Sequence, residues 1–163
     1  MRRRTTRRTA TLAAVIVAMT LGLVATVAAD DGGNRVRLQA RMDGSQEVPP
    51  ADPDGRGRAK ITLNVVTDEI CWDLRFSRIG TPSAGHIHLG GAGVNGGVVF
   101  TLIGPSTPPD PLERGEAEGC AIASAGLAAQ IAANPGGYYV NLHNSRFPDG
   151  AIRGQLGRGG GDD

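Results

Sequence analysis

The chain has 163 residues, is rich in glycine (25 residues) and poor in aromatic residues (4%), and carries a net charge of +1. Five arginines lie among the first eight residues, so the remainder has twelve basic against 16 acidic residues and a net charge of about −4. This balance argues against a nucleic-acid-binding surface. The length suits a single domain.

The N-terminal segment, residues 1–29, has the pattern of a secretory signal peptide. Its arginines precede an uncharged run, Thr9 to Ala29, that ends in small residues. The alternative is an uncleaved membrane anchor, but the apolar part is short for the ~20 residues that a spanning helix needs. We therefore expect cleavage after about Ala29, no membrane segment thereafter, and a location outside the cell or on its surface. Residues 30–34 are polar and predict a linker.

The rest of the chain is dominated by short runs in which apolar and polar residues alternate, the pattern of strands with one buried face. A helix is predicted only over residues 124–133, with Ser124 as its N-cap. The predicted strands cover residues 35–41, 59–65, 70–76, 84–89, 98–103, 113–123, 138–143 and 151–156. We expect one all-β domain over 35–157, an antiparallel β-sandwich or Greek-key barrel of about 7–9 short strands, followed by a flexible tail over 158–163.

The two cysteines, Cys71 and Cys120, both lie in the exported part of the chain. In an oxidising compartment such a pair predicts a disulfide. The alternative is two thiols that contribute to a metal site.

All three histidines lie in predicted strands. His86 and His88 share one face of their strand because side chains alternate, and their Cα atoms are roughly 7 Å apart at ~3.3 Å per residue. If the strand that holds His143 is a neighbour, three imidazoles could bind one copper or zinc ion. The alternative is that these rings hold loops by bonding to backbone carbonyls. Convergence of their nitrogens within about 4 Å would favour the metal.

Other chemistry has little support in the sequence. Phosphate-binding and nucleophile-elbow motifs are absent, and no spacing pairs Glu47, Asp73 or Asp149 as catalytic carboxylates. We therefore predict no catalytic residue and favour a binding module over an enzyme. Arg153 is expected to have a structural role, as an ion-pair partner of Glu47 or Asp73.

Several motifs in the same order resemble the CHRD domain, a module named for its repeats in chordin and also found alone in secreted bacterial proteins. They are Gly44-Ser45-Gln46-Glu47-Val48-Pro49-Pro50, Gly85-His86-Ile87-His88-Leu89-Gly90, Asn95-Gly96, and Tyr138 to His143 followed by Phe147 to Leu156. The resemblance implies an extracellular β-sandwich that binds another extracellular protein or a surface component. It implies no agreed biochemical activity.

A second resemblance concerns only the histidines. Copper–zinc superoxide dismutases have a His-x-His pair on one strand and a copper-ligating histidine on a late strand, and His86, His88 and His143 are similar in order and type. This chain has no histidine left for a bridging ligand or a zinc cluster. The resemblance implies, as the alternative function, a copper-binding protein with redox or superoxide dismutase-like activity.

Overall fold

The computed structural model describes residues 33–107 and 109–159. The predicted signal peptide, most of the linker, and the tail from residue 160 lie outside these residues. The strands are β1 (Arg35–Asp43), β2 (Arg56–Asn64), β3 (Glu69–Ser77), β4 (Ala84–Leu89), β5 (Val98–Ile103), β6 (Glu116–Ile122), β7 (Tyr138–His143), β8 (Ile152–Gln155) and β9 (Gly157–Arg158). The α-helices are α1 (Pro109–Glu113) and α2 (Leu127–Ala133), and the 3₁₀ helices are η1 (Gly44–Gln46) and η2 (Pro135–Gly137).

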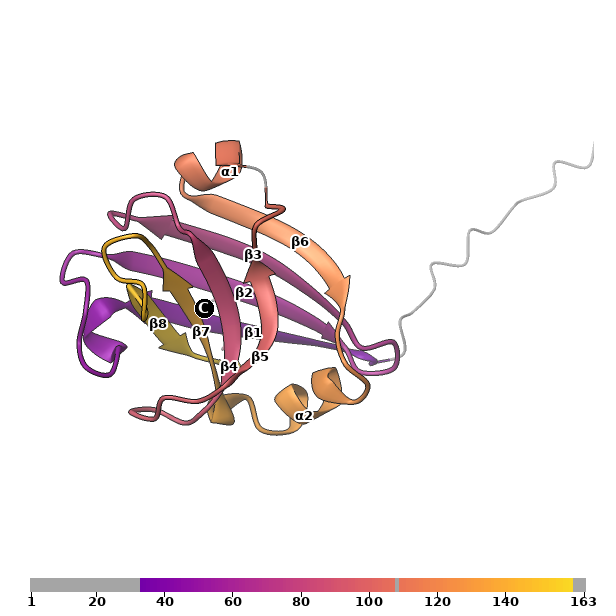
Figure 1. Cartoon of the computed structure of the whole chain (residues 1–163). Helices are drawn as coiled ribbons and strands as arrows, with labels where there is room; N and C mark the ends of the chain where they lie inside the picture. Colours follow the sequence, from indigo (N-terminus) through magenta and orange to yellow (C-terminus); the bar gives the residue numbers. More distant parts are fainter. Residues whose placement is uncertain (1–32, 108, 160–163) are drawn as a thin grey trace, which may run out of the picture.

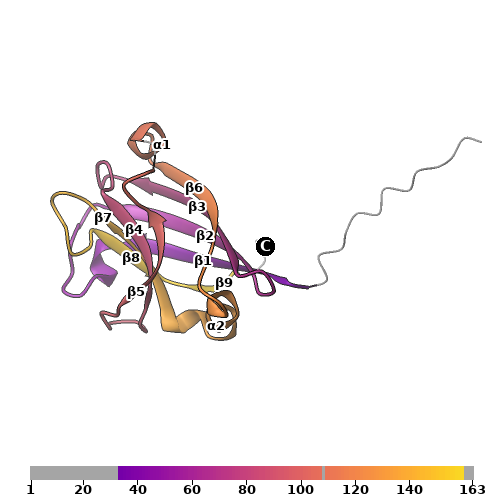
Figure 2. The same cartoon turned by 45° about the vertical axis from the view of Figure 1, so that its right-hand side comes forward.

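All strand pairs are antiparallel, in the order β5-β4-β7-β8-β1-β2-β3-β6, with β9 added to β1. The sheet curls so that β4 and β5 cross over the layer made by β1, β2, β3 and β6, which gives a nearly closed barrel (Figures 1 and 2). The edge-to-face contact of Trp72 in β3 with Phe100 in β5 joins the two layers, with ring centroids 5.9 Å apart. The predicted all-β fold is confirmed.

The core lies between these layers and follows the period of two that the sequence predicts. In β3, Ile70, Leu74 and Phe76 are buried, whereas Arg75 between them is exposed. In β4 and β7, Ile87, Val140 and Leu142 likewise point inward. The outward faces of these two strands therefore carry the alternate residues, which include the histidines.

Two predictions about the ends of elements are wrong. Ser124 does not cap α2, which begins at Leu127; the side chain of Asp68, in the β2–β3 turn, accepts from the backbone N–H groups of Gly126 and Ala128 instead. The predicted tail begins too early, because Arg158 belongs to β9 and its guanidinium donates to the carbonyl of Ala132 at 3.1 Å. Both contacts join segments distant in the sequence, so a local pattern could not reveal them.

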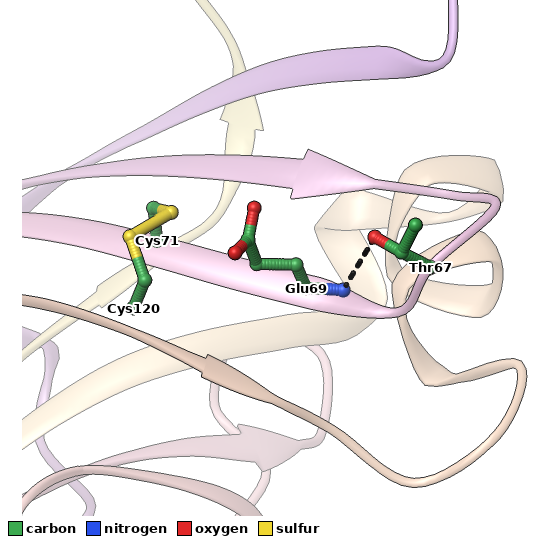
Figure 3. Close-up of a disulfide and its surroundings, with 4 residues drawn as sticks. All are labelled: Thr67, Glu69, Cys71 and Cys120. Atoms are coloured by element: carbon green, nitrogen blue, oxygen red, sulfur yellow. Dashed lines mark hydrogen bonds between the residues drawn. A yellow bond between two sulfur atoms is a disulfide. The ribbon is translucent and has the colours of Figure 1, made fainter.

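The predicted disulfide is present. Cys71 in β3 lies directly opposite Cys120 in β6, and their sulfur atoms are bonded on the outer face of the sheet (Figure 3). The alternative, in which these thiols contribute to a metal site, is therefore wrong. Among the residues that the structure describes, no helix has the length and apolar character to cross a membrane.

Candidate metal centre

The three histidines meet because β4 and β7 are adjacent and antiparallel. Ala84 of β4 lies directly opposite His143 at the end of β7. His86, two residues further along β4, is therefore the diagonal neighbour of His143 on the same face, within reach of a long side chain. His88 follows on this face, opposite Tyr139.

The imidazole nitrogens converge. Nδ1 of His86 lies 3.2 Å from Nε2 of His143, and one ligand nitrogen from each of the three rings falls within 4.8 Å of the others. Nitrogens bound to one ion at ~2.0–2.1 Å lie roughly 3.3–3.5 Å apart in tetrahedral or trigonal geometry. This limit of 4.8 Å exceeds the predicted value of about 4 Å, so the predicted convergence is met only approximately.

Backbone carbonyls orient two of the rings. Nδ1 of His88 lies 2.9 Å from the carbonyl oxygen of Gly96, and Nδ1 of His143 lies 2.9 Å from that of Pro148. A carbonyl oxygen only accepts, so in both neutral rings the proton is on Nδ1 and the lone pair is on Nε2. The alternative prediction, that the rings bond to backbone carbonyls and hold loops, is thus correct for one nitrogen in each of these two rings. The other nitrogen remains available as a ligand, the arrangement that metal-binding histidines show.

The clearest sign of a ligand is Nε2 of His88. This atom is buried and has no hydrogen-bond partner among the described residues. A buried polar atom without a partner costs about 1–3 kcal/mol, so it calls for an explanation. A metal ion between the three rings would satisfy it.

The electrostatic environment keeps the rings neutral. Burial lowers the pKa of all three histidines, and the pKa of His86 falls to about 4 because burial adds to repulsion from His143 and His88. Hydrogen bonds to Gly96 and Pro148 raise the pKa values of His88 and His143, though by less than burial lowers them. At neutral pH the cluster therefore offers three uncharged nitrogen ligands.

The outer face of this part of the sheet is buried by the β4–β5 loop, Gly90–Gly97, which we call the cover loop. Its Gly96 N–H donates to the hydroxyl of Tyr139 at 3.2 Å, while the Gly96 carbonyl accepts from His88. The Tyr139 ring stacks on His88 with centroids 4.8 Å apart and 8° between the planes. The cover loop thus positions His88 in two ways, directly through the Gly96 carbonyl and indirectly through Tyr139.

Arg153 of β8 anchors the cover loop. It is 1% exposed, its guanidinium lies 3.7 Å from the centre of the Tyr139 ring, and it donates to Asn95 Oδ1 and to the carbonyls of Gly91 and Val94. The sequence predicted an ion pair of Arg153 with Glu47 or Asp73, and this is not what forms. Asp73 pairs with Arg75 of its own strand at 3.0 Å.

Glu47 lies beside the site without bonding to Arg153. Its Oε1 accepts from Asn141 Nδ2 at 2.6 Å, and both oxygens pack 2.8 Å from where a Cβ on Gly150 would lie. Burial raises the pKa of Glu47 to about 7, although the positive charge of Arg153 acts to lower it. Tyr139, Asn141 and Gly96 were not predicted as site residues. The alternation along Tyr138–His143 places the first two on the histidine face and was the available signal.

The residues present fit a transition metal. Three neutral imidazoles without a carboxylate suit copper or zinc rather than calcium or magnesium, which prefer oxygen. The described residues contain no other group of three close histidine, cysteine or acidic side chains with this capacity. Three protein ligands leave a further coordination position, as in metal sites that bind small molecules.

Comparison with known proteins identifies the family. The CHRD domain family model matches residues 38–156, which is most of the chain. Searches of curated proteins and of solved structures give no significant match, so the resemblance to copper–zinc superoxide dismutases is not confirmed. The match spans β1 to β8 and includes all three histidines, both cysteines, Glu47 and Arg153. The chain therefore belongs to the CHRD domain family.

Proposed function

We propose that this protein is an exported CHRD module that binds copper through His86, His88 and His143, with zinc as the competing metal. The observation that carries this proposal is the buried, unpartnered Nε2 of His88, whose ring lies beside two other neutral imidazoles. In the described structure Nδ1 of His86 faces the lone pair of His143 and donates to it. A metal would replace this hydrogen atom, and the His86 proton would move to Nε2.

Export rests on the N-terminal pattern and agrees with the disulfide and with the family, whose members include extracellular proteins. It is tested by mass spectrometry of the protein recovered from outside the cell. A mature N-terminus near Asp30 is expected. An intact protein that keeps residues 1–29 and stays with the cells would contradict the proposal.

Metal binding is tested by calorimetric titration of the exported protein with Cu(II) and Zn(II), together with metal analysis of the protein as isolated. The triple variant His86→Ala, His88→Ala, His143→Ala contains no histidine, because the chain has only three. We expect its copper affinity to fall at least a hundredfold while circular dichroism shows the same fold. Equal affinities of the two folded proteins would refute the metal site.

A second candidate function is recognition of an extracellular protein or surface component. Large exposed apolar side chains occur in the cover loop (Val94), at the residues that flank it in the chain (Leu89 and Val98) and at Val48. Val48 is tied to this loop because its carbonyl accepts from Asn95 at 2.7 Å. A photo-crosslinking residue at position 94 should then capture the partner, whereas one at the more exposed Val66, in the β2–β3 turn, should not. Equal capture at both positions would reject this surface.

A further inference from the structure

A positive charge is built in next to the proposed metal site. Tyr139 of β7 lies between His88 of β4 and Arg153 of β8, because β7 is flanked by these two strands. Its ring stacks on the imidazole at 4.8 Å and contacts the guanidinium at 3.7 Å. Two successive contacts of this size place Arg153 less than about 10 Å from His88, within one Debye length at ~0.1 M salt.

This charge is buried and forms no ion pair with the described acidic side chains. The hydrogen bonds of Arg153 go to neutral oxygens, two backbone carbonyls and the side-chain amide of Asn95. The nearby carboxylate of Glu47 is bonded to Asn141 instead. Asp149, beside His143, is exposed, so water screens its charge. A cation bound between the three imidazoles is therefore repelled by Arg153, and the carboxylate of Glu47 offsets part of this repulsion.

Repulsion of this kind discriminates between metal ions by charge. The three ligands add no negative charge, so Cu(I) brings one positive charge into the cluster, whereas Cu(II) and Zn(II) bring two. From this geometry we propose that Arg153 is a specificity-determining residue that biases the three-histidine site toward Cu(I) and against divalent ions. This inference rests on the proposed copper binding and adds the oxidation state that the site favours.

The expected size follows from Coulomb's law. At a separation of about 8 Å and an effective dielectric constant of about 20, each additional positive charge on the metal costs about ten- to thirtyfold in the binding constant. Removal of the guanidinium charge should therefore lower the ratio of Cu(I) to Cu(II) affinity by this factor. A tenfold change in the ratio corresponds to about 59 mV in the one-electron reduction potential of the bound copper.

The test is competition of the exported protein with chromophoric chelators, for Cu(I) under anaerobic conditions and for Cu(II) in parallel, at pH 8. In Arg153→Met, which keeps a long side chain over Tyr139, the Cu(I)/Cu(II) affinity ratio should fall ten- to thirtyfold. Arg153→Lys should keep most of the wild-type ratio. Arg146→Met is the matched control, because Arg146 is three residues after His143, is exposed and lies over the Phe147 ring. The Cu(I)/Cu(II) affinity ratio of this variant should change less than threefold.

A second variant acts in the opposite direction. Glu47→Gln removes the nearest buried negative charge while the amide keeps a hydrogen-bond acceptor for Asn141, so the Cu(I)/Cu(II) ratio should rise. This variant remains informative if Arg153→Met does not fold. An unchanged ratio in folded Arg153→Met, or a fall in Glu47→Gln, would overturn the role of Arg153. Failure of the wild-type protein to bind either copper ion would instead overturn the proposed function.

Discussion

The carbonyl oxygen of Gly96 lies 2.9 Å from Nδ1 of His88, and this contact places the proton of the neutral ring on Nδ1 and leaves the lone pair on Nε2. It arises from backbone alone, because Gly96 has no side chain and sits where none fits. A Cβ at this position would lie 1.5 Å from the carbonyl oxygen of Leu89, far inside van der Waals contact. The close approach of the cover loop to β4 therefore requires glycine at this residue.

Gly96→Ala is predicted to displace the cover loop and to weaken both stability and copper binding. The clash is with backbone atoms, which cannot rotate away, so we expect a loss of about 2–4 kcal/mol in the free energy of unfolding. Loss of the carbonyl partner of His88 should weaken copper binding about 10–100-fold. Gly97→Ala is the matched control, since a Cβ there meets no atom within 4 Å. Denaturant unfolding and copper titration of both variants test the prediction, and similar losses in the two would contradict it.

Tyr139→Phe is predicted to be mildly destabilising. It removes the hydroxyl that accepts from the Gly96 N–H at 3.2 Å but keeps the ring that stacks on His88. The expected loss is about 1–2 kcal/mol, with copper affinity reduced less than tenfold. Tyr138→Phe removes the same group from the opposite face of β7 and should leave copper affinity unchanged. A larger effect on copper binding in Tyr138→Phe than in Tyr139→Phe would count against the role given to the cover loop.

Glu47 should make the protein less stable as the pH rises from 4.5 to 7. Its carboxyl keeps its proton up to about pH 7 in the folded protein, against 4.5 for the ordinary group. Between these values the folded state binds more protons than the unfolded state, so the contribution of Glu47 is full below pH 4.5 and is lost as the pH passes 7. Over this range the loss amounts to at most about 3 kcal/mol at ~1.36 kcal/mol per pKa unit.

Glu47→Gln removes this titration and tests it. Relative to wild type, the variant should gain stability steadily between pH 4.5 and 7, as measured by denaturant unfolding at a series of pH values. Glu118→Gln in β6 is the control, because it makes the same change at an exposed side chain far from the histidines in the strand order. If the stability difference between Glu47→Gln and wild type stays constant from pH 4.5 to 7, burial does not perturb this carboxyl.

Removal of the disulfide should reduce stability but not copper affinity. Cys71 and Cys120 are 49 residues apart in sequence, and a cross-link of this span contributes about 3–4 kcal/mol by restricting the unfolded chain. The bond joins β3 to β6, whereas the histidines lie on β4 and β7. The variant Cys71→Ala, Cys120→Ala should therefore unfold more easily and bind copper as wild type does. A loss of copper affinity in the folded variant would contradict this prediction, because it would show that the disulfide affects the histidine cluster.

The sequence by itself determined most of the strands and singled out the three histidines of the candidate site. Alternation along residues such as Ile70 to Phe76 specifies a strand and its buried face, because the side-chain period of a strand is two. The same rule placed His86 and His88 on one face. Periodicity is a local property and can be read from one segment at a time.

Only the tertiary structure decided which strands are neighbours and which loops cover them. The pairing of β4 with β7 brings His143 to His86 across 57 residues of sequence, and the cover loop orients His88 through Gly96. Arg153 was expected to meet a carboxylate, yet it lies against Tyr139 and neutral oxygens. The energy of such contacts depends on burial and distance between remote segments, and no pattern within a single segment contains that information.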